Sequence, residues 1–342
     1  MDGWPLKALV TGSTGFIGSA LCRELVAQGV AVRAFHRSSS SLLLLEGLDV
    51  EHTIGDLTQP DTLREALVGV DVVFHTAAQL GAPDNPGRMY AVTVEGTRAV
   101  LDAALDARVQ RLVHTSSVAA LGVPETRVGQ VSPQEVAWMN ENHTWNYRPD
   151  YWMYGYTKYL AELEVQKAIA RGLDAVIVNP TYVIGAGDIH RQSSSPIVQV
   201  ALQKLRFATE GGFNVVHLAD VVAGHLAALQ KGRTGERYIL GNENLTIAHT
   251  LHKIAQIVGV PSPNILLPGG LLRTIASPIE RFQSLIDLPV SASTLHQAGY
   301  GFYYDTGKAR IELGLTNLHS VDQAIQEAYD WFVQVGTLVK RA

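Results

Sequence analysis

A tyrosine and a lysine four residues apart have the types and spacing that proton-transfer chemistry needs. Tyr154 and Lys158 stand at the start of a stretch with helical apolar periodicity, so both side chains lie on one helical face. A phenol with a pKa of about 10 exchanges protons poorly at neutral pH unless a nearby cation stabilises its phenolate. The pair therefore indicates a general acid or base. The alternative is an ion pair between Lys158 and Glu162 on a solvated helix surface.

A hydroxyl at the end of an apolar strand is the third candidate. Ser117 follows the strand expected over residues 111–116, and the carboxyl ends of strands form the ligand-binding edge of a parallel sheet. We predict that the Ser117 hydroxyl hydrogen-bonds the substrate oxygen, with Ser116 as the alternative. A turn or a helix cap would also explain a pair of serines at this position. The predicted catalytic residues are Ser117, Tyr154 and Lys158.

A glycine-rich turn lies near the start of the chain, between an apolar strand over 6–10 and a helix over 15–28. A tight turn, a close approach to phosphate and close helix packing each exclude a Cβ, and a helix N-terminus attracts a pyrophosphate. An ordinary turn is the alternative. The predicted cofactor-binding residues here are Gly12, Thr14, Gly15, Phe16, Ile17 and Gly18.

The end of the second strand is where a dinucleotide site distinguishes its cofactors. An acidic residue there usually binds a ribose 2′-hydroxyl, whereas arginine binds a 2′-phosphate. The strand ends with His36, Arg37 and Ser38, and no acid follows until Glu46. NADP(H) is therefore favoured and NAD(H) is the alternative, with Arg37 as the main contact and His36 or Ser38 as helpers.

The elements that must position these residues alternate between short apolar runs and helical periods. Further strands are expected over 30–35, 71–76, 111–116 and 175–179, with helices over about 92–107 and 154–170. This alternation predicts an α/β fold with a doubly wound parallel Rossmann sheet and a smaller, mixed C-terminal cap. Residues 1–180 form the predicted Rossmann domain, to which 215–240 and about 301–315 return; 181–214 and 241–300 form the cap, and 316–342 a C-terminal helix.

The motifs together resemble a known family. The run Thr11-Gly12-Ser13-Thr14-Gly15-Phe16-Ile17-Gly18 is similar to the glycine signature of the extended short-chain dehydrogenases/reductases, in the NAD-dependent epimerase/dehydratase superfamily. Over about residues 6–332 the chain resembles the dihydroflavonol reductase-like branch, through Trp152-Met153-Tyr154, Lys158-Tyr159-Leu160-Ala161-Glu162, Val178-Asn179-Pro180-Thr181 and Val216-His217-Leu218-Ala219-Asp220-Val221-Val222.

The resemblance implies roles for further residues. It implies adenine contacts for Asp56 and Leu57, although Asp56 could equally cap the helix that begins near Pro60. It also implies that Ala77 and Ala78 flank the adenine ribose, that Pro180, Thr181 and Val183 lie near the nicotinamide amide, and that Lys158 also holds the nicotinamide ribose. His75 and His217 are expected to be structural.

One position departs from the family pattern. The family commonly has Asn where Thr93 stands, and that Asn belongs to a proton relay behind the lysine, so the resemblance leaves open whether a Thr hydroxyl replaces it. Family members often dimerise through the helices that carry Thr93 and Tyr154 here, which implies a homodimer.

The resemblance implies an NADP(H)-dependent oxidoreductase that interconverts a carbonyl and an alcohol. A dehydratase is discounted, because no acid follows Ser117 through Gly122. A nucleotide-sugar epimerase is the alternative, but the basic residues of the cap are scattered among apolar ones, which favours a small, largely apolar substrate. A third hypothesis is a non-catalytic dinucleotide-binding protein. It is disfavoured because the chain contains Ser117, Tyr154 and Lys158.

The segment over 132–151 contains several aromatic residues, which fit an aromatic lid beside the nicotinamide and ordinary packing onto the cap equally well. Trp152, Gln192 and Ser193 are the candidate substrate contacts, and a flexible loop would explain the last two as well.

Composition limits the classes of function. Of 342 residues 46% are hydrophobic, and the net charge of -5 comes from 27 basic and 32 acidic residues without a basic cluster, so no nucleic-acid partner is expected. The single cysteine, Cys22, excludes an internal disulfide and a cysteine zinc site, and we predict no metal. No signal peptide is recognisable at residues 1–7, and the apolar stretch over 265–279 is too short to span a membrane. A cytoplasmic protein is expected.

Overall fold

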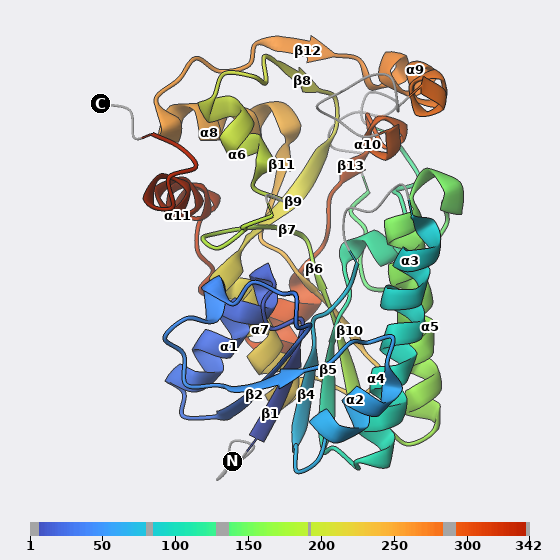
Figure 1. Ribbon diagram of the computed structural model, residues 1–342. Coiled ribbons are helices and arrows are strands. Elements are labelled where there is room, and N and C mark those ends of the chain that lie inside the picture. Colours follow the sequence, from blue (N-terminus) through green and yellow to red (C-terminus); the bar gives the residue numbers. More distant parts are fainter. Residues whose placement is uncertain (1–6, 80–84, 128–136, 191–192, 283–291, 340–342) are drawn as a thin grey trace.

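The core of the protein is a seven-stranded parallel sheet, seen in the lower half of Figure 1. The computed structural model describes residues 7–79, 85–127, 137–190, 193–282 and 292–339. The strand order is β10-β6-β5-β4-β1-β2-β3. The strands are β1 (Lys7–Thr11), β2 (Ala31–His36), β3 (Glu51–Ile54), β4 (Val72–His75), β5 (Arg111–Thr115), β6 (Ala175–Pro180) and β10 (Arg237–Leu240).

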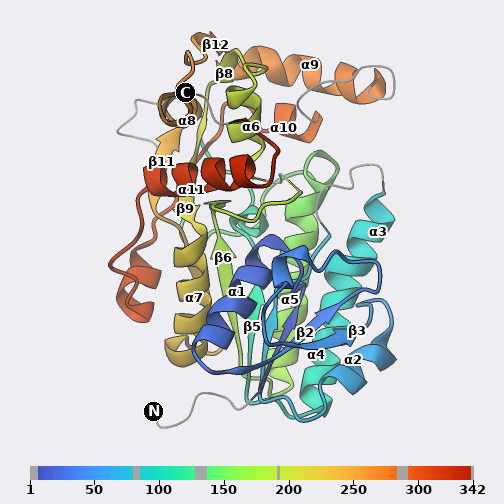
Figure 2. The ribbon, with the colours of Figure 1, turned by 60° about the vertical axis from the view of Figure 1, so that its left-hand side comes forward.

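Helices cover both faces of this sheet, which is why its central strands are near-continuous apolar runs. On one face α1 (Phe16–Ala27) and α7 (Leu218–Lys231) pack with side chains such as Val10, Leu21 and Val221. On the other face lie α2 (Pro60–Ala66), α4 (Gly96–Asp106) and α5 (Met153–Ala170), which Figures 1 and 2 show from two sides.

The order of the strands reverses beside β1, whose neighbours are β2 and β4. In sheets of this type a ligand binds at the carboxyl ends of the strands where the order reverses. The strands β1, β4 and β5 end at Thr11, His75 and Thr115, so the glycine turn and Ser117 follow strands at the same edge of the sheet. The fold thus brings together the segments that carry the predicted site.

The cap lies beyond that edge (Figure 1). Its larger sheet has the order β11-β9-β13 with β7 also paired to β9, and its smaller sheet pairs β12 with β8. These strands are β7 (Tyr182–Ile184), β8 (Phe207–Thr209), β9 (Gly212–His217), β11 (Glu243–Thr246), β12 (Ile265–Leu267) and β13 (Gly301–Phe302). The cap helices are α6 (Ser195–Ala201), α8 (Ile247–Val258), α9 (Gly269–Phe282) and α10 (Ala292–His296).

Short helices complete the described chain. They are η1 (Leu43–Leu45), α3 (Pro86–Tyr90), η2 (Ala91–Glu95), η3 (Val118–Leu121), η5 (Pro149–Tyr151) and η7 (Ala309–Leu313). The last helix, α11 (Val321–Gln334), packs against α6, α8 and β9 in the cap core, with Ile325 and Phe332 buried there. Within the described ranges, no helix combines the length and the apolar character needed to cross a bilayer.

The division between the two parts differs in detail from the sequence prediction. Residues 215–217 in β9 and 301–302 in β13 lie in the cap sheet, whereas the prediction assigned both to the Rossmann domain. Of the described residues after β6, those of α7, β10 and η7 return to the first domain, where η7 contacts α7 and β10. An apolar strand such as β9 has the same pattern in either sheet, so only its pairing partners decide where it lies.

Candidate active site

The structure brings Ser117, Tyr154 and Lys158 together at the carboxyl end of β5. Lys158 is 3% exposed, and its Nζ donates a hydrogen bond to the carbonyl oxygen of Thr115 at 2.8 Å. Ser117 caps η3, where its Oγ accepts from the backbone N–H of Ala119 at 3.1 Å, and it also hydrogen-bonds the Tyr154 side chain. Ser117 and Tyr154 are half-buried. A hydroxyl and a phenol thus meet just after β5, and the ammonium group of Lys158 is buried against the last residue of that strand.

The electrostatics of the trio follow from burial. Burial raises the pKa of the Tyr154 phenol, and the hydrogen bond with Ser117 opposes that shift. Burial also lowers the pKa of Lys158 to about 8, while the nearby Glu162 carboxylate acts in the opposite direction. The phenol therefore carries its proton at neutral pH, as a group that donates a proton to a carbonyl oxygen must.

The solvated ion pair between Lys158 and Glu162, the alternative considered from the sequence, is not what the structure shows. Glu162 is buried, and its carboxylate binds Asn179 and Arg237 instead. The sequence predicted no role for Asn179 or Arg237, and for Glu162 only the surface ion pair with Lys158. The available signal was the spacing, because Tyr154, Lys158 and Glu162 recur every four residues on one helical face.

The glycines of the turn have three different environments. Gly12 has a φ of +67°, and a Cβ there would lie 2.8 Å from the backbone of Ala77. A Cβ on Gly18 would lie 2.2 Å from the carbonyl oxygen of Gly12, so this glycine lets α1 pack against the turn. At Gly15 the nearest atom would be 3.2 Å away, and no side chain caps α1 there.

These environments fit a bound pyrophosphate. The first glycine makes the turn, the third packs the helix, and the second leaves space beside the free N–H groups of the helix N-terminus. Thr14, Phe16 and Ile17 are half-buried around that position. Ser13 Oγ donates to the carbonyl oxygen of Phe35 at 3.1 Å and ties the turn to β2.

The end of β2 presents Arg37 to solvent. His36 is turned inward, with Nε2 hydrogen-bonded to His52 Nδ1 at 3.2 Å and Nδ1 to the Arg37 carbonyl at 3.1 Å. Asp56, which follows β3, accepts from the Thr58 N–H at 2.9 Å, and this bond, together with the Arg37 charge, lowers the pKa of Asp56. The capping role considered for Asp56 is wrong, because Gln59 occupies the N-cap position of α2, where its side chain makes no capping hydrogen bond.

The other residues assigned to the cofactor line the same edge of the sheet. Ala77 and Ala78 are half-buried after β4, Leu57 is buried, and Pro180 ends β6. Thr181 Oγ1 donates to Asn214 Oδ1 at 3.0 Å, which ties this segment to the cap, and Val183 lies in β7.

The substrate candidates have mixed outcomes. Gln192 lies outside the described residues. Ser193 Oγ donates to the Val183 carbonyl at 2.5 Å and its N–H to Asp188 at 3.0 Å, so it braces its own loop. Trp152 packs against Phe302 of the cap, with ring centroids 5.6 Å apart, immediately before α5.

Two histidines and one threonine have structural partners. His75 is buried between Thr11 Oγ1 at 2.7 Å and Thr97 Oγ1 at 2.9 Å, and His217 caps α7. Both fit the structural roles predicted for them. Thr93 is buried in η2, where its Oγ1 accepts from the Gln79 N–H at 3.2 Å.

Aromatic residues from the segment before α5 enclose the start of that helix. Trp145 packs against Trp152, Tyr156 and Tyr159, at centroid distances of 6.1, 5.7 and 6.3 Å. Residues 132–136 of this segment lie outside the described ranges. The described rings pack on both α5 and the cap, so aromatic side chains lie beside the first turns of α5.

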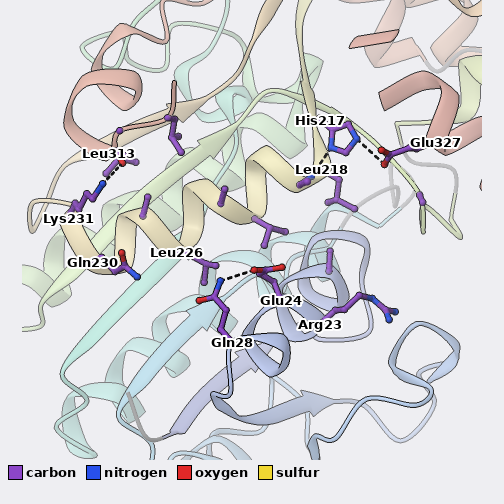
Figure 3. Close-up of a pocket in the computed structure, with 18 residues that line it drawn as sticks. Arg23, Glu24, Gln28, His217, Leu218, Leu226, Gln230, Lys231, Leu313 and Glu327 are labelled. Atoms are coloured by element: carbon purple, nitrogen blue, oxygen red, sulfur yellow. Dashed lines mark hydrogen bonds and ion pairs between the residues drawn. The ribbon is translucent and has the colours of Figure 1, made fainter. Parts of the chain in front are cut away.

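A groove of about 680 Å³ lies elsewhere, between α1 and α7 (Figure 3). Residues from both helices line it, including Glu24 and Leu226, together with Leu313 and Glu327. These two helices cover the face of the sheet opposite α5. The groove is therefore separate from the trio of Ser117, Tyr154 and Lys158.

Comparison with known proteins agrees with this arrangement. The NAD dependent epimerase/dehydratase family model matches residues 8–241. "Sterol demethylase protein B" of Methylococcus capsulatus is 35% identical over 97% of this chain and 100% of its own, and a "putative dihydroflavonol 4-reductase" of Synechocystis is 36% identical over 96% and 94%. A solved nucleoside-diphosphate-sugar epimerase of Pseudomonas aeruginosa has a TM-score of 0.79 and 27% identity over 97% of this chain and 99% of that one.

A family model that matches most of the chain, together with relatives of this identity that align over nearly all of it, is decisive. The chain belongs to the NAD dependent epimerase/dehydratase family, in the extended short-chain dehydrogenase/reductase group, and is an NAD(P)-dependent oxidoreductase.

Proposed function

We propose that this protein is an NADP(H)-dependent reductase that interconverts a carbonyl and an alcohol on a small, largely apolar substrate. The observation that carries the proposal is the contact between Ser117 and Tyr154 with the ammonium group of Lys158 buried beside them. The reductase name of the Synechocystis relative supports the same class of reaction.

In the proposed reaction each residue has one task. Ser117 binds and polarises the substrate oxygen, and Tyr154 donates its proton to that oxygen as the carbonyl is reduced. Lys158 provides the positive charge that stabilises the phenolate left behind. The nicotinamide supplies the hydride when it is bound. Gly12, Gly15 and Gly18 with the N-terminus of α1 would hold its pyrophosphate.

The preference for NADP(H) rests on Arg37. Its guanidinium is exposed after β2, where a 2′-phosphate would form charge-assisted hydrogen bonds with it. The acidic group nearby is Asp56, which comes from the end of β3 rather than β2, and whose carboxylate already accepts two hydrogen bonds from Thr58.

An apolar substrate is supported by the rings around the start of α5. Trp152, which immediately precedes α5, packs against Phe302 of the cap, so apolar surface from both parts of the chain lies near Tyr154 in the first turn of α5. A nucleotide-sugar epimerase is the second candidate, because the Pseudomonas structure bears that name. NAD that co-purifies with the protein, or conversion of UDP-glucose to UDP-galactose, would favour the epimerase.

The proposal is tested by NADPH oxidation with a panel of aldehydes and ketones. We expect faster turnover with NADPH than with NADH, and a loss of at least about 100-fold in kcat for Tyr154→Phe, because the general acid is removed. Tyr156→Phe is the matched control on the same helix, since that phenol packs against Trp145, and it should keep wild-type turnover. Unchanged kcat in Tyr154→Phe would overturn the mechanism.

A further inference from the structure

The helix that carries Tyr154 and Lys158 holds a third ionisable side chain on the same face. Glu162 follows Lys158 by one turn of α5, and its side chain is 1% exposed. Carboxylates are almost never buried to this extent without a partner. The partners of Glu162 therefore indicate what it does.

Glu162 is paired by residues from two neighbouring strands. Asn179 Nδ2, in β6, donates to Glu162 Oε1 at 2.7 Å. Arg237 Nε, in β10, lies 2.8 Å from Glu162 Oε2, and another nitrogen of the same guanidinium donates to the His143 carbonyl at 3.1 Å. Glu162 Oε1 thus accepts a hydrogen bond from β6 and Oε2 forms an ion pair with β10, so α5 is fixed to both strands.

Asn179 connects this carboxylate to Ser117. The same Nδ2 donates a second hydrogen bond, to the carbonyl oxygen of Ser117 at 2.9 Å. An amide nitrogen carries two N–H groups, so one side chain can make both bonds. The position of the Ser117 backbone relative to α5 is therefore set by Asn179, and Asn179 is oriented by Glu162.

Glu162 also supplies negative charge near Lys158. Among the described residues, His75 of β4 and His114 of β5 also interact electrostatically with Lys158; burial lowers the pKa of both histidines, so they are neutral at pH 7. Arg237 of β10 faces Glu162, and Arg98 of α4 is bonded to Glu164. Among the described residues, Glu162 is the carboxylate coupled to the ammonium group.

We propose that Glu162 is a positioning residue of the reaction centre, which holds Ser117 in place through Asn179 and supplies the counter-charge of Lys158. The inference rests on the reductase function proposed above. Buried ion pairs seldom add net stability compared with apolar packing, so fixed geometry is the better explanation for retaining this one.

The test replaces Glu162 by Gln, which keeps the size of the side chain and removes its charge. We expect kcat for NADPH-dependent ketone reduction to fall about 10-fold with less than about a 2-fold change in KM, because positioning acts in the transition state. We also expect the alkaline limb of the kcat profile to move to lower pH by at least about 0.5 unit, because loss of a nearby anion lowers the pKa of Lys158.

Glu164→Gln is the matched control, two residues along the same helix. Glu164 is also paired with an arginine, Arg98, but it does not contact Asn179. It should leave both kcat and the alkaline limb unchanged. If Glu162→Gln alone unfolds because Arg237 is left without its carboxylate, the double variant Glu162→Gln/Arg237→Gln removes both charges and should shift the alkaline limb in the same direction but by less, because loss of the Arg237 charge acts in the opposite direction.

A second readout needs no substrate. In protein labelled with ¹³C at the lysine ε-carbon, the Lys158 resonance is identified by its absence in Lys158→Arg, and its titration midpoint should fall in Glu162→Gln but not in Glu164→Gln. Equal midpoints in wild type and Glu162→Gln would overturn the proposal for Glu162. A lowered midpoint in a protein that reduces no carbonyl would support the role of Glu162 and count against the proposed function alone.

Discussion

Gly15 and Gly18 make the assignment of the cofactor turn testable, because alanine is expected to act differently at each. A Cβ at Gly18 would lie 2.2 Å from the Gly12 carbonyl oxygen and 2.8 Å from Thr76 Oγ1, so the turn and α1 must separate. Overpacking of this kind costs about 1–3 kcal/mol. A Cβ at Gly15 meets one atom, at 3.2 Å, and the residue already has a φ of -83°. Gly15→Ala should therefore change the stability of the cofactor-free protein by less than about 1 kcal/mol.

Thermal unfolding with and without NADPH measures both effects. Without NADPH, Gly18→Ala should lower the Tm by several degrees and Gly15→Ala by much less. NADPH at about 100 times its Kd should add about 2.7 kcal/mol to the stability of the wild type. Gly15→Ala should lose most of this gain, because its methyl group would stand where the pyrophosphate approaches the backbone. If Gly15→Ala destabilised the cofactor-free protein as much as Gly18→Ala, or kept the full gain from NADPH, the turn would not be the pyrophosphate site.

Two further predictions concern charge. Lys158 has a folded pKa of about 8 against an ordinary value of 10.5, so the unfolded chain binds more protons between these values and the wild type gains stability as the pH rises through that window, by up to about 3 kcal/mol. Lys158→Met lacks this pH-dependent contribution to the free energy of unfolding. Thermal unfolding at pH 7 and pH 10 should therefore show the stability of the wild type increasing relative to that of the variant at the higher pH. The same stability difference at both pH values would contradict a buried ammonium group. Arg37→Asp should raise the KM for NADPH about 10- to 100-fold with little change for NADH, whereas the exposed control Arg23→Asp should alter neither, and an unchanged cofactor preference would exclude Arg37 from phosphate binding.

The parallel sheet and the order of its elements could be predicted from the sequence because buried parallel strands read as continuous apolar runs between helical periods. Val176 and Phe74 are fully buried in such runs. The pairing of β9 could not be predicted, since the same run fits either sheet. Asp56 had the right type for a helix cap, but α2 begins at Pro60, so the N-cap position is Gln59, three residues after Asp56.

The site was predictable to the extent that local spacing determines it. Tyr154 and Lys158 share a helical face wherever that helix lies, and the glycines of the turn follow from backbone geometry. The contacts of Asn179 with Ser117 and Glu162 span 62 and 17 residues, so no local pattern reveals them. Burial of a carboxylate is likewise invisible in a sequence, where an i, i+4 pair with lysine suggests a solvated surface.

A short connection at the end of β6 joins the Rossmann sheet to the cap sheet. Pro180 is the last residue of β6 and Tyr182 the first of β7, so one residue, Thr181, separates the Rossmann sheet from the cap sheet. Thr181 is fixed from both sides, since its N–H donates to the Leu240 carbonyl at 3.0 Å and its Oγ1 to Asn214 in β9. Asn179, two residues earlier, binds Ser117. The strand that holds Ser117 therefore leads directly into the strand that anchors the cap, and under the proposed function the three residues Asn179, Pro180 and Thr181 would set the position of a cap-bound substrate relative to Ser117.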